Sequence, residues 1–165
     1  MLTNLDAGFA VLEPWAEALL RLCVGLALVP HARRNTFNMF SKTGQPHRSI
    51  AALAAYLDKE GYRPGKVWAP PISLTQLVCG PLLAMGLLTR LVALPIVLFL
   101  LVSNIERWRV GKYFWNQLGL EYTLMWTIAA LYFFVRGGGI ISLDHILFGT
   151  GDLRSQCICF AIRAE

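Results

Sequence analysis

Two charged side chains stand inside an apolar segment near the N-terminus. Glu17 and Arg21 lie within EPWAEALLRLCVGLALVPHARR, which covers residues 13–34. A helix places residues i and i+4 on one face, so the two side chains are expected to form a charge pair. One interpretation is a self-neutralising pair, with Arg21 extending toward lipid headgroups. The other is an arginine that faces the interior of a bundle and stabilises an anionic ligand or neighbour, because ionisable groups within a membrane are candidates for function.

A second set of polar residues flanks the later apolar segments. If four helices run up and down, the first and third end, and the second and fourth begin, on the same face of the bundle. That face carries His31, Gln76, Asn104, Trp115, Asn116 and Glu121, with Arg107 and Arg109 beside them. A polar pocket with an aromatic rim would suit a quinone headgroup. The quinone-binding candidates are Gln76, Asn104, Trp115 and Asn116, and the catalytic candidates are Glu121 and His31.

These residues also have structural interpretations. Aromatic side chains collect at membrane boundaries, so Tyr113, Phe114 and Trp115 fit anchors as well as a cofactor cage. A single histidine such as His31 is often a hydrogen-bonded structural residue. If quinone is reduced here, Glu121 is the residue expected to accept or release the proton.

The sequence carries no motif for a tightly bound redox cofactor. It has no C-x-x-C, no metal-spaced His and Cys cluster and no Gly-rich phosphate loop. Cys23 and Cys79 fall in apolar segments, where thiols behave as small apolar groups. Cys157 and Cys159 form a C-x-C that could oxidise or bind metal. We expect no bound metal or flavin, so electrons would need a partner subunit or direct two-electron chemistry.

The composition predicts a membrane protein. Of 165 residues, 56% are hydrophobic and 15% are charged, against about 25% charged in a soluble domain. Lipid offers the backbone no hydrogen-bond partners, so apolar blocks of about 17–25 residues are expected to be helices. Four such blocks lie at 14–31, 71–89, 91–107 and 118–135. The predicted fold is all-α: residues 1–165 form a single membrane domain, a polytopic four-transmembrane-helix bundle.

Local features indicate how the bundle is assembled. The second and third blocks meet at Thr89 and Arg90, which predicts a tight antiparallel turn. Pro81 is expected to kink the second helix. Gly80 and Ala84 form a small-xxx-small pair suited to close packing. The first block lacks a basic n-region and a cleavage site, so it is expected to be an anchor and not a signal peptide.

The connections are predicted to be a basic loop, 32–70, and a C-terminal tail, 136–165, with an amphipathic stretch. Within the loop we expect a short amphipathic helix that Ser49 caps and Gly61 ends. Its apolar face would lie either in the membrane interface or against the end of the bundle. That face carries Ile50, Leu53, Ala54 and Leu57.

The placement of charge suggests an orientation. The formal net charge is +5, and most Lys and Arg fall between the first two helices and between the last two. Because such residues normally stay cytoplasmic, both long loops are predicted to be cytoplasmic and both termini outside, in the cell inner membrane. The clusters flank apolar helices, so lipid is the expected partner and nucleic acid is not.

Four segments in this order carry a resemblance: LLRLCVGLALVPHA, LVCGPLLAMGLLTRLVAL, GKYFWNQLGLEYTLMW and GGGIISLDHIL. Together, over most of residues 15–148, they resemble the DoxX family of small four-helix integral membrane proteins. The residues on the family's pattern are Arg21, His31, Arg90, Glu121, Tyr122 and Asp144. Two departures are Gln76, where many members carry Glu, and the unusually basic first loop.

The resemblance implies a membrane redox system, since members include the membrane subunit of thiosulfate:quinone oxidoreductases. The chain is predicted to be a membrane subunit of a quinone-linked redox system, working with other subunits. The alternative is a non-catalytic accessory or assembly subunit that docks and stabilises a larger membrane complex. A role in handling small solutes or lipids is a third hypothesis. Gln76 removes a possible proton carrier, so whether the chain is catalytic stays open.

Overall fold

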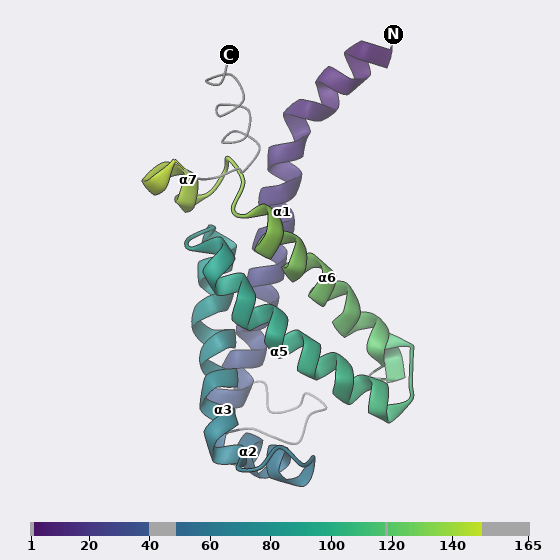
Figure 1. Cartoon of the computed structure of the whole chain (residues 1–165), viewed down its shortest axis with the longest axis vertical. Helices are drawn as coiled ribbons and strands as arrows, with labels where there is room; N and C mark the ends of the chain where they lie inside the picture. The colour runs from purple at the N-terminus through teal and green to yellow at the C-terminus, as the bar shows by residue number, and fades with distance from the viewer. Residues whose placement is uncertain (1, 40–48, 118, 150–165) are drawn as a thin grey trace, which may run out of the picture.

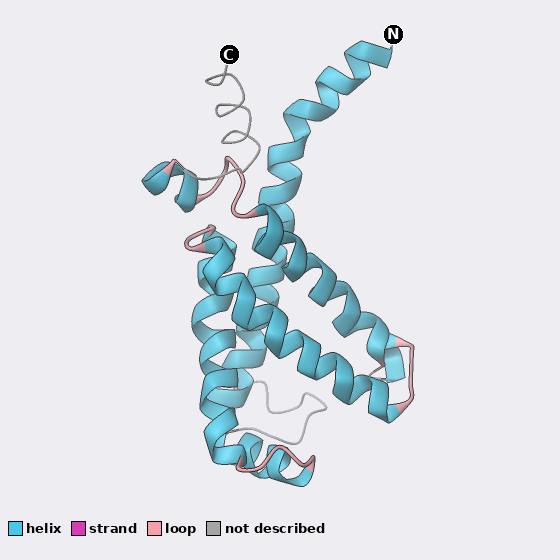
Figure 2. Ribbon diagram, in the orientation of Figure 1, coloured by secondary structure: helices cyan, strands magenta, loops and turns pink. Residues whose placement is uncertain are grey.

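The computed structural model describes residues 2–39, 49–117 and 119–149, and all regular structure in these ranges is helical (Figure 2). The predicted all-α class is confirmed. A π-helical turn, η1 (Thr75–Cys79), joins α3 to α4, and a 3-10 turn, η2 (Trp115–Gln117), precedes α6. The α-helices are α1 (Leu2–Phe37), α2 (Ile50–Lys59), α3 (Gly65–Leu74), α4 (Gly80–Met85), α5 (Thr89–Val110), α6 (Leu120–Arg136) and α7 (Leu143–Phe148).

Two pairs of helices make up most of the molecule (Figure 1). α1 runs beside the continuous rod of α3, η1 and α4, and α5 runs beside α6. The pairs meet near the α4–α5 turn and α7, which we call the closed end. They separate toward the other end, where α2 lies by α3 and the α5–α6 turn stands apart. We call this the open end.

The observed helices extend beyond the predicted apolar blocks. α1 continues to Phe37 and α3 begins at Gly65, so the predicted loop 32–70 is shorter than expected and also contains α2. The turn between the second and third helices lies at 86–88, before Thr89. Gly86 and Leu88 there have φ of +70° and +51°, in the left-handed region that ends a helix and that glycine adopts without strain.

Small residues let α1 and α4 approach closely. A Cβ added to Gly25 would lie 2.5 Å from the Ala84 backbone nitrogen, and one added to Gly80 would lie 2.9 Å from the Gly25 carbonyl oxygen. Small side chains permit such close contact between helices. The predicted packing role of Gly80 and Ala84 is therefore confirmed. The π-helical turn η1 ends at Cys79, two residues before Pro81. Proline has no backbone N–H to donate to the carbonyl oxygen four residues earlier, as a regular α-helix requires.

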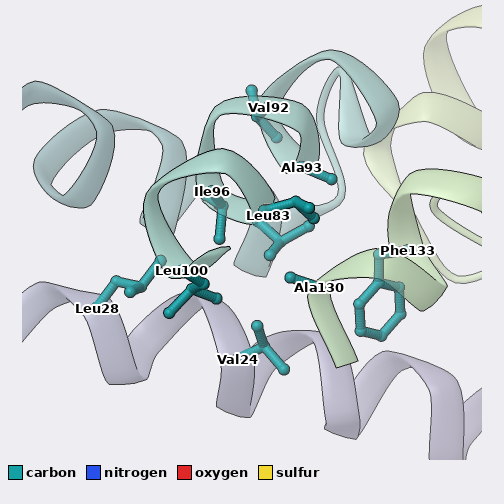
Figure 3. Packing of buried hydrophobic residues seen from close by; sticks show 10 residues of the cluster. Val24, Leu28, Leu83, Val92, Ala93, Ile96, Leu100, Ala130 and Phe133 are labelled. Atoms are coloured by element: carbon teal, nitrogen blue, oxygen red, sulfur yellow. The ribbon is translucent and has the colours of Figure 1, made fainter. Parts of the chain in front are cut away.

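The main core joins both pairs of helices (Figure 3). Val24 of α1, Leu83 of α4, Ile96 of α5 and Phe133 of α6 are each 1% exposed or less. The rest of this cluster is Leu28, Val92, Ala93, Val97, Leu100 and Ala130. Because one cluster spans α1, α4, α5 and α6, these helices pack as a unit.

α2 packs on α3 and forms a second, smaller core with it. Ser49 is the N-cap of α2, as predicted, since its Oγ accepts a hydrogen bond from the Ala52 N–H at 3.1 Å. The apolar face of α2 is covered by α3, with Leu53, Ala54, Leu57 and Ala69 buried. Of the two predicted placements for this face, the structure therefore supports packing against the end of the bundle.

Large apolar side chains remain exposed around this core. Leu91 and Leu98 of α5 are 69% and 55% exposed, and Met125 and Ile128 of α6 are 67% and 60% exposed. Two helical segments of the described chain, Gly65–Met85 and Thr89–Val110, are long and apolar enough to cross a membrane. Only 33% of each apolar window is buried, unlike the core helix of a soluble protein.

Candidate functional site

Arg21 is buried at the closed end and is held by backbone carbonyl groups. It is 4% exposed. Its guanidinium donates to the carbonyl oxygens of Gly138, of Ile141 at 2.6 Å and of Ala84 at 3.5 Å. Gly86 makes room for it, because a Cβ there would lie 2.7 Å from Arg21 Cζ. The side chain thus ties α1 to the end of α4 and to the loop after α6.

Asp144 of α7 holds the first turn of α5. Its Oδ1 accepts from the Leu88 N–H at 2.6 Å, and its Oδ2 accepts from the Thr89 N–H at 2.8 Å. Its own N–H donates to the Gly86 carbonyl oxygen at 2.8 Å. A carboxylate at a helix N-terminus satisfies free N–H groups and complements the helix dipole. Asp144 also interacts electrostatically with Arg21.

Glu17 pairs across the bundle and not with Arg21. Its Oε1 lies 3.1 Å from Arg136 Nε and accepts a hydrogen bond from the Tyr132 hydroxyl. Arg136 also reaches Glu13 at 3.2 Å. Glu17 and Arg21 therefore make no direct ion pair, but they interact electrostatically as residues i and i+4 of one helix. The carboxylate finds a closer partner on α6, and Arg21 points to carbonyls deeper in the fold.

These residues form what we call the closed-end cluster: Glu13, Glu17, Arg21, Arg90, Arg136 and Asp144. Its three guanidiniums and three carboxylates balance in formal charge. Arg90 donates to the Arg136 carbonyl oxygen at 3.3 Å, so the loop after α6 is held from both sides. Buried ions that lose a partner cost about 3–5 kcal/mol. The cluster can therefore fix the relative positions of α1, α5, α6 and α7.

The structure separates the predicted quinone pocket into three places. Gln76 lies in η1 and is buried against α1, where the Asn35 amide donates to its Oε1 at 3.1 Å. His31 is half-buried one helical turn before Asn35. Asn104 of α5 instead donates to the Thr127 hydroxyl of α6 at 2.8 Å. The first and second places belong to different helix pairs.

The third place is the α5–α6 turn. Trp115 and Asn116 are exposed in η2. Glu121 lies in the first turn of α6, and its Oε2 accepts from the Trp115 backbone N–H at 3.2 Å. Figure 1 shows this turn well apart from α3 and α1. Helix ends that share one side of a bundle need not converge, because the two pairs diverge from the closed end.

The basic residues near α5's C-terminus line a crevice at the open end. It has a volume of about 190 Å³ and is lined by Tyr56, Glu60, Glu106, Arg107, Arg109 and Val110. The Tyr62 hydroxyl donates to Glu106 at 2.5 Å, and Arg109 pairs with the same carboxylate at 3.1 Å. This hydrogen bond to Glu106 is the main cause that raises the pKa of Tyr62 above its usual value. Arg107 and Arg109 therefore belong to a surface between α2 and α5.

No group of three or more His, Cys, Asp or Glu side chains able to hold a metal occurs among the described residues. Cys23 and Cys79 are free thiols. The predicted behaviour of Cys157 and Cys159 lies outside the residues that the structure describes.

Fold and site first define a class: a small helical protein with widely exposed apolar helices and a charge-balanced cluster at one end. The chain belongs to the DoxX family, because the family model described as DoxX matches residues 16–105. That range includes Arg21 and Arg90 but ends before Glu121 and Asp144. Comparisons with curated proteins and with solved structures found no match. Family membership and the apolar helices indicate a membrane protein.

Several partners in these contacts were not predicted. Tyr132, Asn35 and Thr127 each meet a predicted residue from another helix. Tyr132 and Arg136 are spaced i, i+4 on α6, which could have suggested a polar stripe facing Glu17. The carbonyl acceptors of Gly138 and Ile141 leave no side-chain signal, although a run of glycines does favour exposed backbone.

Proposed function

We propose that four helical segments cross the bilayer: α1, α3 with η1 and α4, α5, and α6. Two of these are apolar and long enough by themselves, and α6, with 17 residues, reaches the lower limit of about 17. The shared core supports the other two, since a bilayer that contains α4 and α5 also surrounds the α1 and α6 residues packed on them. Extraction of the protein by carbonate wash would overturn this proposal.

We place the open end, with its basic residues, on the cytoplasmic side of the inner membrane and both termini outside. Exposed Lys and Arg gather at the open end, at Arg33, Lys59, Arg63, Lys66, Arg109 and Lys112. Single cysteines at positions 3 and 45, in a background without native cysteines, test this with a membrane-impermeant thiol reagent on intact cells. The cysteine at position 3 should react. Reaction of the cysteine at position 45 alone would contradict the proposed orientation.

Within the membrane, we propose that the chain is a subunit of a quinone-linked redox system and that it anchors and docks other subunits. The observation that favours docking is the open end, where the described residues include six exposed cations and one exposed carboxylate, Glu60. The charged side chains of the closed-end cluster already bind one another or the backbone. The redox centre would therefore belong to a partner that the basic surface binds.

Native-membrane purification tests the docking role. The charge-reversed variant Lys59→Glu, Arg63→Glu, Lys66→Glu should lose co-purifying redox proteins while inserting normally. Glu60→Gln is the matched control on the same surface and should retain them. If a deletion strain still assembles its redox complexes at normal yield, the docking role is wrong.

A direct role in quinone binding is a second candidate, favoured by one observation at η1. Ser73 is 4% exposed, and its hydroxyl has no hydrogen-bond partner. It lies three residues before Gln76, whose side chain is also buried. A buried hydroxyl without a partner is costly, and a quinone carbonyl would accept its hydrogen bond. The candidate headgroup site is then Ser73, Gln76 and Asn35, with His31 nearby.

Bound quinone tests this second candidate. Purified protein should contain quinone extractable by organic solvent, and Ser73→Ala with Gln76→Leu should lower the amount at least tenfold. Ser103→Ala is a matched control, because its hydroxyl bonds only to the Phe99 carbonyl of its own helix. An unchanged quinone content in the double variant would exclude this site.

A further inference from the structure

α7 turns its carboxylate toward the protein and its apolar side chains away from it. Asp144 is 8% exposed, whereas Ile146, Leu147 and Phe148 are 74%, 60% and 58% exposed. The helix has only six residues, too few to be stable alone in water. It is held in place by the Ser142 hydroxyl, which accepts from the His145 N–H at 3.1 Å, and by Asp144. Three consecutive large apolar side chains thus stand uncovered on a firmly attached helix.

The attachment fixes the height of α7 along the bundle. Asp144 bonds to Gly86, the residue that follows the apolar segment Gly65–Met85, and to Leu88 and Thr89, where α5 begins. α7 therefore lies at the level where the apolar segment Gly65–Met85 ends and the segment Thr89–Val110 begins. Figure 1 shows it lying across the direction of α3 and α4 rather than along it.

The neighbouring surface at this level is apolar too. Leu88 in the turn and Leu91 in the first turn of α5 are 44% and 69% exposed, and Ile140 before α7 is 53% exposed. Apolar surface therefore continues from the outside of α5 to α7. The material that surrounds α5 is then the natural cover for α7 as well.

We propose that α7 is an interfacial helix, which lies in the plane of the bilayer surface with Ile146, Leu147 and Phe148 among the ends of the acyl chains. Helices of this kind insert their apolar face into the boundary between headgroups and acyl chains. The partner is a lipid surface. This inference rests on the proposed membrane crossing, because the height of α7 is defined by the ends of α4 and α5.

Spin labels on the full-length protein in phospholipid vesicles test the proposal. With native cysteines replaced by serine, single cysteines are introduced at exposed sites as Ile146→Cys, Phe148→Cys, Leu98→Cys and Lys59→Cys. The nitroxide at each position is assayed for collisions with oxygen, which concentrates in lipid, and with a nickel chelate, which stays in water. Leu98 is the bilayer reference on α5, and Lys59 is the aqueous reference on α2.

We expect positions 146 and 148 to favour oxygen over the chelate severalfold relative to position 59, and less strongly than position 98. If both behave like position 59 while position 98 favours oxygen, α7 is not interfacial and the membrane crossing stands. If position 98 also behaves like position 59, both proposals are wrong. Low access of both reagents to 146 and 148 would mean that protein covers them, for example a second copy of the chain, and would overturn the lipid assignment.

Discussion

The closed end and the open end contain similar kinds of residues and treat them differently. At the closed end, Arg21 and Asp144 are nearly fully buried and bind backbone groups of three other segments. At the open end, Arg109 is 60% exposed and its ion partner, Glu106, lies three residues away on the same helix. The charged groups of the closed end join distant parts of the chain, whereas the ion pair between Arg109 and Glu106 at the open end is local.

The difference shows where charge can be placed in an apolar bundle. Buried charges need partners with good geometry, and the loop after α6 supplies the carbonyl oxygens of Gly138 and Ile141 to Arg21. Exposed pairs at a membrane boundary are hydrated, and such pairs contribute about 0–1 kcal/mol. We therefore expect the closed end to determine stability and the open end to be free for contacts with partners.

The largest effect is expected when the closed end loses its arginine. Arg21→Leu leaves the carbonyls of Gly138 and Ile141 without a donor and Asp144 with less opposing charge. The free energy of unfolding should fall by about 3–5 kcal/mol, measured by denaturing-detergent titration in mixed micelles. Arg33→Leu makes the same change at an exposed position of α1 and should change it by less than about 0.5 kcal/mol. Equal losses in both variants would contradict the closed-end assignment.

A smaller effect is expected from crowding the contact between α1 and α4. Gly25→Leu forces a side chain against Ala84 and Gly80, and overpacking of this kind costs about 1–3 kcal/mol. Cys23→Leu is the control, because Cys23 is exposed on the same helix. Thermal denaturation in detergent should show a lower midpoint for Gly25→Leu alone. A midpoint equal to that of the control would mean that the helices do not approach as closely as described.

The contact between Asn104 and Thr127 should contribute less free energy of unfolding than the Arg21 contacts or the packing of α1 on α4. Hydrogen bonds between membrane helices average about 0.6 kcal/mol, and this one pairs neutral side chains at 2.8 Å. A double-mutant cycle with Asn104→Leu and Thr127→Val is expected to give a coupling near that value. A coupling above about 2 kcal/mol would contradict this expectation and show that the α5–α6 pair depends strongly on this polar contact.

The smallest effect concerns the titration of Tyr62 at the open end. The hydrogen bond to Glu106 raises the pKa of Tyr62, so folding favours the protonated phenol. The corresponding stabilisation is complete below the pKa of about 10 of an unperturbed tyrosine and is lost as the pH rises through the higher pKa of the folded state. The Tyr62 signal in NMR spectra of ¹³C-labelled tyrosine can be assigned with Tyr62→Phe. Its titration should give a lower pKa for Tyr62 in Glu106→Gln than in the unchanged protein. An unshifted signal would exclude this hydrogen bond.

The sequence could predict features that depend on residues near one another in the chain. The mainly helical character of the four apolar blocks, the Ser49 cap and the Gly80–Ala84 packing pair follow from local composition and spacing, and the structure confirms these three features. The partners of Glu17 and Arg21 could not be predicted in the same way. Tyr132 and Gly138 lie more than 100 residues from them, and which helix faces which depends on how the pairs cross.

By itself, then, the amino-acid sequence determined the helical class, the apolar character of the chain and its place in the DoxX family, because hydropathy and short motifs are properties of contiguous residues. Only the tertiary structure decided that the charges near residue 20 lock one end of the bundle and that the predicted pocket residues lie in three places. The physical reason is that helices diverging from one fixed end bring together side chains at that end and separate those at the other.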